Sequence, residues 1–241
     1  MKLCRFELLA EPNKARTGFV AQGKVYETDG QQPIGIHLPS DVRLLSPVLP
    51  PSIRLFTGEG DDLGFVYLNP ATVRGSGEPI PLPPFATPAG YMPCVAAVIA
   101  VAGKGLEPSE ADGLVLGLSL GLVIYGGAGD SARSRDVGFV LGPAITTPDD
   151  LEDRATEDAR GRRYHLEIGA RRGEDMPLKT SLADIEPTLA ELIAYASESA
   201  VLRPGDVIAY ALPQIAEGTL EPGHDVAVLS DALGTLAARA I

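Results

Sequence analysis

Residues 189–213 read LAELIAYASESAVLRPGDVIAYALP, and they contain the clearest helix and one of the clearest strands of the chain. Apolar residues recur at three- and four-residue spacing from Leu182 to Ala196, which predicts an amphipathic helix over about residues 184–198. The apolar run after the Pro-Gly pair predicts a strand over residues 206–211. This stretch therefore predicts one helix followed closely by one strand.

Outward from this stretch, the chain of 241 residues contains 27 Gly and 21 Pro, so we expect short elements and many turns. The fold class is predicted as mostly β with two or three helices (α+β). Residues 1–50 are predicted to form a small N-terminal β domain and residues 51–241 the main domain, with Pro50–Pro51 as the linker. Further strands are expected at 3–9, 17–21, 24–28, 53–56, 94–102, 116–125 and 225–229, with a tight turn at Gln22–Gly23 and a short helix from about Pro108.

The formal net charge of −12 makes nucleic acid and anionic membranes poor partners. No uncharged apolar stretch reaches the ~20 residues that a membrane helix needs, and the first residues lack a signal-peptide core. The two cysteines, Cys4 and Cys94, form neither a disulfide framework nor a zinc site, and Cys94 is expected to be a small core residue. We therefore expect a cytoplasmic protein.

Several phrases of the sequence resemble the fumarylacetoacetate hydrolase (FAH) family. They are MKLCRFE at the start, LLSPVLPPSIRLF (44–56), NPATVRGSGEPIPLP (69–83), LGPAITTPDDLED (141–153), the opening stretch, and LEPGHDVAVLSDALGTL (220–236). The resemblance implies a mixed β-roll core with a small N-terminal β domain, usually as a homodimer. It also implies hydrolysis, decarboxylation or isomerisation of keto-enol or dicarbonyl acids. In the family these reactions use Mg²⁺ or Mn²⁺ held by three carboxylates, and a His–Glu pair on a lid loop.

The positions that the resemblance assigns to the three metal-binding carboxylates are Val95, Ala97 and Val123 in this sequence. No Asp or Glu lies between Glu78 and Glu107, so no shift of the alignment restores the first two. None lies between Asp112 and Asp130 either. A hard divalent cation needs charged oxygen ligands, which aliphatic side chains cannot supply. We therefore expect no metal at this site and no cofactor.

The lid is also reduced, because only TGEGDDLG separates Phe56 from Phe65 and it contains no histidine. The position of the family's lysine is occupied by Arg133, which cannot act as a base near neutral pH. Asp130, Arg133, Arg135 and Asp136 form the charged cluster nearest the expected cleft. Arg133, with Arg135, is a candidate for binding an anionic ligand, and Asp130 or Asp136 for acid–base chemistry. The alternative is a solvated loop whose ion pairs contribute little.

Two hypotheses follow. In the first, the protein is a divergent, metal-independent FAH-family member that acts as a pseudoenzyme or small-molecule binder, or as a structural partner of an active paralogue. In the second, it is an enzyme on a keto-enol or dicarbonyl compound, such as a hydrolase, tautomerase, isomerase or cyclase, working through Arg133 and a nearby carboxylate. The sequence leaves open whether the protein is catalytically active. The acidic run 148–163 is expected to be a solvated loop, or else an interaction surface.

Overall fold

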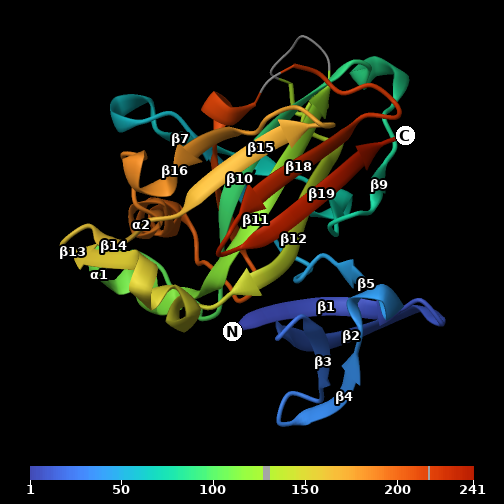
Figure 1. Cartoon of the computed structure of the whole chain (residues 1–241). Coiled ribbons are helices and arrows are strands. Elements are labelled where there is room, and N and C mark those ends of the chain that lie inside the picture. Colours follow the sequence, from blue (N-terminus) through green and yellow to red (C-terminus); the bar gives the residue numbers. More distant parts are fainter. Residues whose placement is uncertain (127–130, 217) are drawn as a thin grey trace.

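The computed structural model describes residues 1–126, 131–216 and 218–241, and it is mostly β, as the sequence predicts. Strands of the N-terminal part run in sequence along one end of a large sheet (Figure 1). They are β1 (Lys2–Leu8), β2 (Glu11–Ala21), β3 (Lys24–Thr28), β4 (Pro33–His37) and β5 (Val42–Leu45). Gln22 and Gly23 have φ values of 50° and 70°, which confirms the predicted tight turn between β2 and β3.

The N-terminal strands are continuous with the core, because β1 pairs antiparallel with β12 in the register Lys2↔Thr146. The large sheet then continues through the core in the order β12, β11, β10, β17, β6, β7, with β8 attached to β12. These strands are β6 (Ile53–Thr57), β7 (Gly64–Leu68), β8 (Val73–Arg74), β10 (Ala89–Ile99), β11 (Val115–Gly126), β12 (Gly138–Thr146) and β17 (Val207–Ala211). The boundary predicted at residue 50 stays a prediction.

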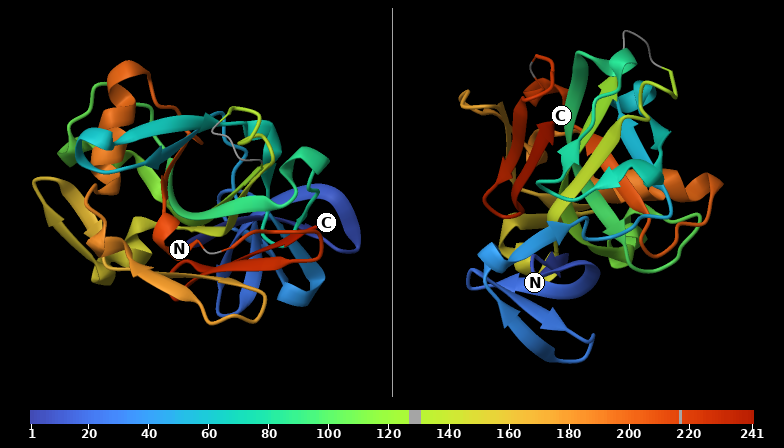
Figure 2. Two further views of the ribbon diagram at one scale, coloured as in Figure 1. Left: turned by 90° about the horizontal axis from the view of Figure 1, so that it is seen from above. Right: turned by 90° about the vertical axis from the view of Figure 1, so that its right-hand side faces the viewer.

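A second sheet lies against the first, in the order β16, β15, β18, β19, β9. Its strands are β9 (Pro79–Ile80), β15 (Glu167–Arg172), β16 (Leu178–Ser181), β18 (Asp225–Ser230) and β19 (Gly234–Ala240). Seen from above in Figure 2, the strands of the two sheets curve around a common interior. The largest cluster of buried apolar side chains fills this interior, and it includes alternate residues of β10, β11, β15, β18 and β19. The arrangement is a β-roll.

The α-helices are α1 (Pro108–Ala111) and α2 (Leu189–Ser199), and short 3₁₀ helices lie in the loops. The 3₁₀ helices are η1 (Pro39–Asp41), η2 (Gly60–Asp62), η3 (Pro70–Thr72), η4 (Pro84–Ala86), η5 (Asp112–Leu114), η6 (Pro148–Arg154), η7 (Leu182–Asp184) and η8 (Pro213–Ile215). Within the described residues, no helix combines the length and apolar composition needed to cross a membrane.

Helix α2 begins five residues later than the sequence pattern suggests. Thr188 is its N-cap: its hydroxyl accepts from the Glu191 N–H at 3.1 Å, and the Glu191 carboxylate accepts from the Thr188 N–H at 2.8 Å. This reciprocal capping box fixes the helix start. Leu182 and Ile185 are nevertheless buried. The apolar spacing therefore predicted which side chains are buried, but its prediction of the helix start was wrong.

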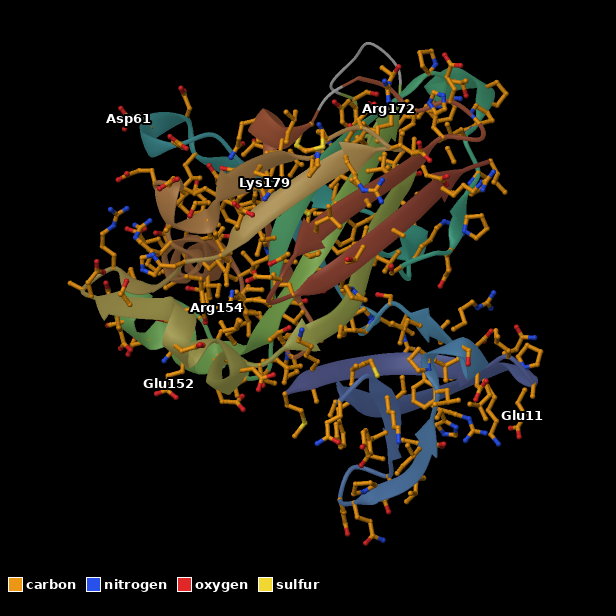
Figure 3. All side chains as sticks on the ribbon, in the orientation of Figure 1. Glu11, Asp61, Glu152, Arg154, Arg172 and Lys179 are labelled. Atoms are coloured by element: carbon orange, nitrogen blue, oxygen red, sulfur yellow. The ribbon has the colours of Figure 1, made fainter. Side chains whose placement is uncertain are left out.

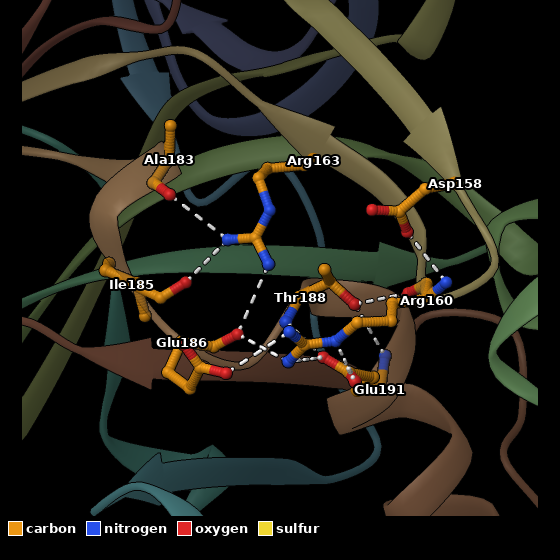
Figure 4. Close-up of polar contacts among 8 residues, drawn as sticks. All are labelled: Asp158, Arg160, Arg163, Ala183, Ile185, Glu186, Thr188 and Glu191. Atoms are coloured by element: carbon orange, nitrogen blue, oxygen red, sulfur yellow. Dashed lines mark hydrogen bonds and ion pairs between the residues drawn. The ribbon is translucent and has the colours of Figure 1, made fainter.

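The run 148–163 is not a solvated loop. It forms η6 and most of a hairpin of β13 (Ala155–Asp158) and β14 (Gly161–Tyr164). Two arginines of this hairpin hold the segment that leads into α2 (Figure 4). Arg160 contacts both carboxylate oxygens of Glu191 at 2.7 and 3.0 Å, and Arg163 donates to the carbonyls of Ala183 and Ile185 at 3.1 and 2.7 Å. The basic residues therefore fix a helix N-terminus.

Candidate functional site

A hollow of about 370 Å³ lies at one end of the roll interior, and we call it the mouth hollow. It is lined by Tyr91, Ala170, Arg171, Arg172, Asp175, Met176, Leu178, Ile215 and Gly218. These residues come from β10 of the large sheet, from β15 and β16 of the second sheet, and from the segment around η8. Only the closing of the two sheets brings them together.

Arg172 is directed toward the hollow by the alternation of β15. Ile168 and Ala170 belong to the buried interior cluster, and side chains two apart on a strand point to the same face. Arg172 continues this row at the end of the strand, opposite Val226 of β18. Figure 3 shows Arg172 at the upper end of β15. The position of this cation is thus set by strand register.

The guanidinium of Arg172 is fixed by contacts at the rim. Its Nη1 donates to the carbonyl of Thr219 at 3.1 Å, and its Nε lies 3.9 Å from the Asp175 carboxylate. Gly218 has a φ of +77°, and a Cβ at this position would lie 2.6 Å from Nη1. The positive φ favours glycine at this position, and a methyl group there would require the guanidinium to shift. Arginine has five N–H donors, more than this carbonyl contact uses.

The floor of the mouth hollow is formed by buried residues. Tyr91, Ala170 and Ile215 are exposed by 3%, 2% and 1%, respectively. The rim is open, since Met176 and Leu178 are 88% and 39% exposed. A cation at the edge of a hollow suits a small ligand that has a carboxylate, because guanidinium and carboxylate form strong charge-assisted hydrogen bonds.

The profile of the family described as "Fumarylacetoacetate (FAA) hydrolase C-terminal" matches residues 58–240 of this chain. The chain belongs to the fumarylacetoacetate hydrolase family. A search of curated protein sequences finds no match.

Solved structures of other proteins agree with this membership at the level of the fold. The 2-hydroxyhepta-2,4-diene-1,7-dioate isomerase of Mycobacterium marinum superposes with a TM-score of 0.85 at 21% identity, covering 100% of this chain and 98% of its own. The 5-carboxymethyl-2-hydroxymuconate delta-isomerase of Mycobacterium smegmatis gives 0.83 at 22%, covering 100% and 98%. The maleylpyruvate hydrolase of Sphingobium sp. SYK-6 gives 0.80 at 20%, covering 100% and 99%, and one of its structures contains manganese(II) and pyruvate.

Among the positions assigned to the family's metal ligands, the structure brings Val95 and Ala97 together but not Val123. Val95 and Ala97 are fully buried and face the roll interior, whereas Val123 packs in the cluster on the other face of the sheet. Val123 pairs with Met92 on β10, and Met92 and Val95 point to opposite faces of the sheet. These three positions therefore cannot surround one ion.

Strands β10 and β11 offer no suitable ligands for Mg²⁺ or Mn²⁺, whichever of their residues is aligned with the family's metal-binding positions. Neither β10, AGYMPCVAAVI, nor β11, VLGLSLGLVIYG, contains a carboxylate. Within residues 1–126, 131–216 and 218–241, no group of three or more His, Cys, Asp or Glu side chains is placed to hold a metal ion. A hard cation would have to lose water ligands here without charged oxygens to replace them.

The described members of the expected charged cluster lie in and next to one turn and have separate side-chain partners. Asp130 lies outside the described residues. Arg133 is exposed and stacks on the ring of Phe85, with its guanidinium carbon 4.2 Å from the ring centroid. Asp136 accepts a 2.6 Å hydrogen bond from the Asn69 side-chain amide, and Arg135 is half-buried. None of these described residues lines the mouth hollow.

Sequence reasoning missed Arg172, because β15 is not among the expected strands and no motif singles out its last residues. The shortened lid made a further contact that sequence reasoning missed. The buried Tyr210 hydroxyl donates to the carbonyl of Gly58 at 3.1 Å. Burial, together with the nearby Glu59 carboxylate, raises the pKa of Tyr210 to about 12, so this phenol stays protonated. The lid is thereby tied to the roll.

Proposed function

We propose that this FAH-family protein binds a small, carboxylate-bearing molecule in the mouth hollow and does so without a carboxylate-held divalent metal. One observation carries the proposal: β10 and β11 have no acidic residue, while Arg172 supplies a positive charge above the buried floor of Tyr91 and Ile215. In this proposal, the positive charge at the site comes from the Arg172 side chain and not from a metal ion.

An arginine in place of a metal ion changes the chemistry that the site can support. A chelated metal ion acts as a Lewis acid and stabilises negative charge that develops on a ligand oxygen. Arginine offers hydrogen bonds and a fixed charge, but it stays protonated and so cannot serve as a base. Tyr210, with its raised pKa, is a poor base near neutral pH and does not line the mouth hollow. The arrangement favours recognition of an acid over cleavage of a carbon–carbon bond, which supports a binding protein or pseudoenzyme.

The competing hypothesis is a metal-free enzyme that uses Arg133 and a nearby carboxylate. It would require Arg133 to leave the Phe85 ring and Asp136 to leave Asn69 in order to reach a ligand in the mouth hollow. The geometry therefore supports this hypothesis less well than binding at Arg172.

Calorimetric titration with pyruvate and with oxaloacetate, each with EDTA or with MnCl₂, tests the proposal. We expect saturable, EDTA-insensitive binding that Arg172→Gln weakens by about tenfold or more, because hydrogen bonds to charged groups contribute ~1.5–3 kcal/mol. Arg239→Gln is the matched control, since it removes the same charge from an exposed position of the same sheet. Binding that requires Mn²⁺, or turnover of oxaloacetate that Arg133→Ala abolishes, would contradict it.

A further inference from the structure

A second hollow, of about 510 Å³, lies beside helix α2, and we call it the helix hollow. Its walls come from α2, from Gly60 and Leu63 of the lid, from residues 105–108 at the start of α1, and from Arg160 in the turn between β13 and β14. Among the described residues, none lines both this hollow and the mouth hollow. The helix hollow is thus a separate space, and its volume suits a small molecule.

One face of α2 forms a wall of the helix hollow. Glu191, Tyr195 and Glu198 line the hollow and follow one another at four- and three-residue spacing, which places them in one row along the helix. Leu192 and Ile193, on another face of α2, are fully buried in the interior cluster. The helix therefore buries its apolar face in the roll and presents this row to the hollow.

Tyr195 gives the helix hollow an aromatic surface. It is 41% exposed, and its ring makes edge-on contacts with Phe56 and Phe65, with centroids 5.7 and 6.3 Å away. Such contacts between aromatic rings are stabilising, so they hold the ring in place. Leu106 and Pro187 add apolar surface to the same hollow. A fixed and exposed ring attracts organic cations through its π-electrons, and this attraction is independent of any carboxylate.

The charged side chains that line the helix hollow favour a cation over an anion. The guanidinium of Arg160 is already bound, since Nε and Nη2 lie 2.7 and 3.0 Å from the Glu191 carboxylate and Nη1 lies 3.2 Å from Glu186 (Figure 4). Glu107 is used as the N-cap of α1. Glu198 has no hydrogen-bond or ion-pair partner within the part of the chain that the structure describes. A cation therefore finds a free carboxylate beside the aromatic ring.

We propose that the helix hollow binds a small primary amine that carries an apolar carbon chain. The ammonium group is bound by the Glu198 carboxylate and the Tyr195 ring, and the chain packs on Leu106 and Pro187. Primary amines have pKa values of about 10 and so stay protonated near neutral pH. The net charge of −12 attracts cations to the protein surface. The proposal does not depend on the function proposed above.

The apolar surface of the helix hollow favours an organic cation over a metal ion. Within the described residues, no group of three or more His, Cys, Asp or Glu side chains is placed to hold a metal ion. A hard divalent cation would need several oxygen ligands at once, and the ring and apolar side chains supply none. An amine needs only one carboxylate, and its carbon chain gains from contact with the apolar walls.

The first test uses three compounds that have the same five-carbon chain and differ in charge. Pentylamine, 1-pentanol and pentanoate are each titrated into the native chain by calorimetry at low ionic strength. We expect saturable binding of pentylamine alone, because only the ammonium group is attracted to the carboxylate and the ring. Added salt should weaken this binding, since it screens exposed charges. No saturable binding of pentylamine, or equal binding of 1-pentanol, would overturn the proposal.

The second test locates the amine by substitution. Glu198→Gln should raise the dissociation constant of pentylamine about threefold or more, because it removes the free carboxylate. Glu152→Gln is the matched control, since it removes the same charge from an exposed position outside the hollow, and it should have no effect. Tyr195→Leu should weaken binding about threefold, whereas Tyr195→Phe keeps the ring and should bind normally. Unchanged affinity in Glu198→Gln, or in folded Tyr195→Leu, would show that the amine does not bind here.

Discussion

The hydroxyl of Ser52 donates a 2.8 Å hydrogen bond to the carboxylate of Asp206, across 154 positions of sequence. The same carboxylate accepts from the Arg203 N–H at 2.9 Å and lies 3.8 Å from Arg54 Nη1. Both charged side chains are almost fully buried. Through Asp206, the turn that follows α2 is joined to the start of β6, which pairs in parallel with β17.

Replacing Asp206 should destabilise the fold strongly. In Asp206→Ala, Arg54 would be left as a buried charge without its carboxylate, and breaking a buried pair from one side costs ~3–5 kcal/mol. Ser52→Ala removes a neutral hydroxyl that donates to Asp206 and accepts from Arg54 Nη1 at 3.1 Å, and it should cost less, about 1.5 kcal/mol. Urea denaturation of the two variants measures the difference. Equal, small losses of unfolding free energy would mean that the pair does not stabilise the sheet.

Glu191 should make the stability of α2 depend on pH. Burial alone would raise the pKa of Glu191, but hydrogen bonds from Arg160 and Thr188 outweigh it and hold the pKa below the usual 4.5. The stabilisation is therefore present above about pH 4.5 and is lost as the pH falls through the lowered pKa. Glu191→Gln should cost ~1 kcal/mol at pH 7, and the difference from the native chain should shrink in acid.

Thermal unfolding from pH 3 to 8 checks this expectation. Glu186→Gln is the control, because Glu186 is 66% exposed and makes a single 3.2 Å side-chain contact to the same arginine. We expect it to change stability little at any pH. A constant difference between Glu191→Gln and the native chain across this range would show that the carboxylate charge is not involved.

Gly218→Ala should close the mouth hollow to ligands. The new methyl group would lie against Arg172 Nη1, so the guanidinium has to shift. Gly223→Ala has the same backbone cost, at a φ of +97°, but its methyl group meets nothing within 4 Å. Both variants should lose ~1 kcal/mol of stability, and Gly218→Ala should also lose pyruvate binding, as measured by calorimetry. Equal binding by both variants would place the ligand elsewhere.

Both cysteines should be inert in the native protein. Burial raises the pKa of Cys4 to about 12, and burial raises the pKa of Cys94 further still. Only the thiolate reacts appreciably with alkylating agents, so iodoacetamide should label neither residue until urea unfolds the chain. Mass spectrometry counts the labels. Rapid labelling of Cys94 in folded protein would identify an accessible thiol in the roll.

Local signals in the sequence found some elements and missed others. The tight turn at Gln22–Gly23 and the strand after Pro204–Gly205 were predictable, because turn chemistry and an apolar run act over a few residues. Strand β12 was not among the predicted elements, since its Gly142–Pro143 step interrupts any simple pattern. It is stabilised as a strand by pairing with β1, β8 and β11, which come from distant parts of the chain.

The sequence by itself determined family membership and the absence of acidic residues from the strands at 89–99 and 115–126, because both depend only on which residues are present. Tertiary structure alone decided where Arg133 and Arg172 point. The alternation of a strand assigns each side chain to a face, but pairing with distant strands decides which face becomes the interior. Pairing of β15 with β18 thus brings Arg172 to the mouth hollow, whereas Arg133 lies in a turn between two strands and rests on Phe85.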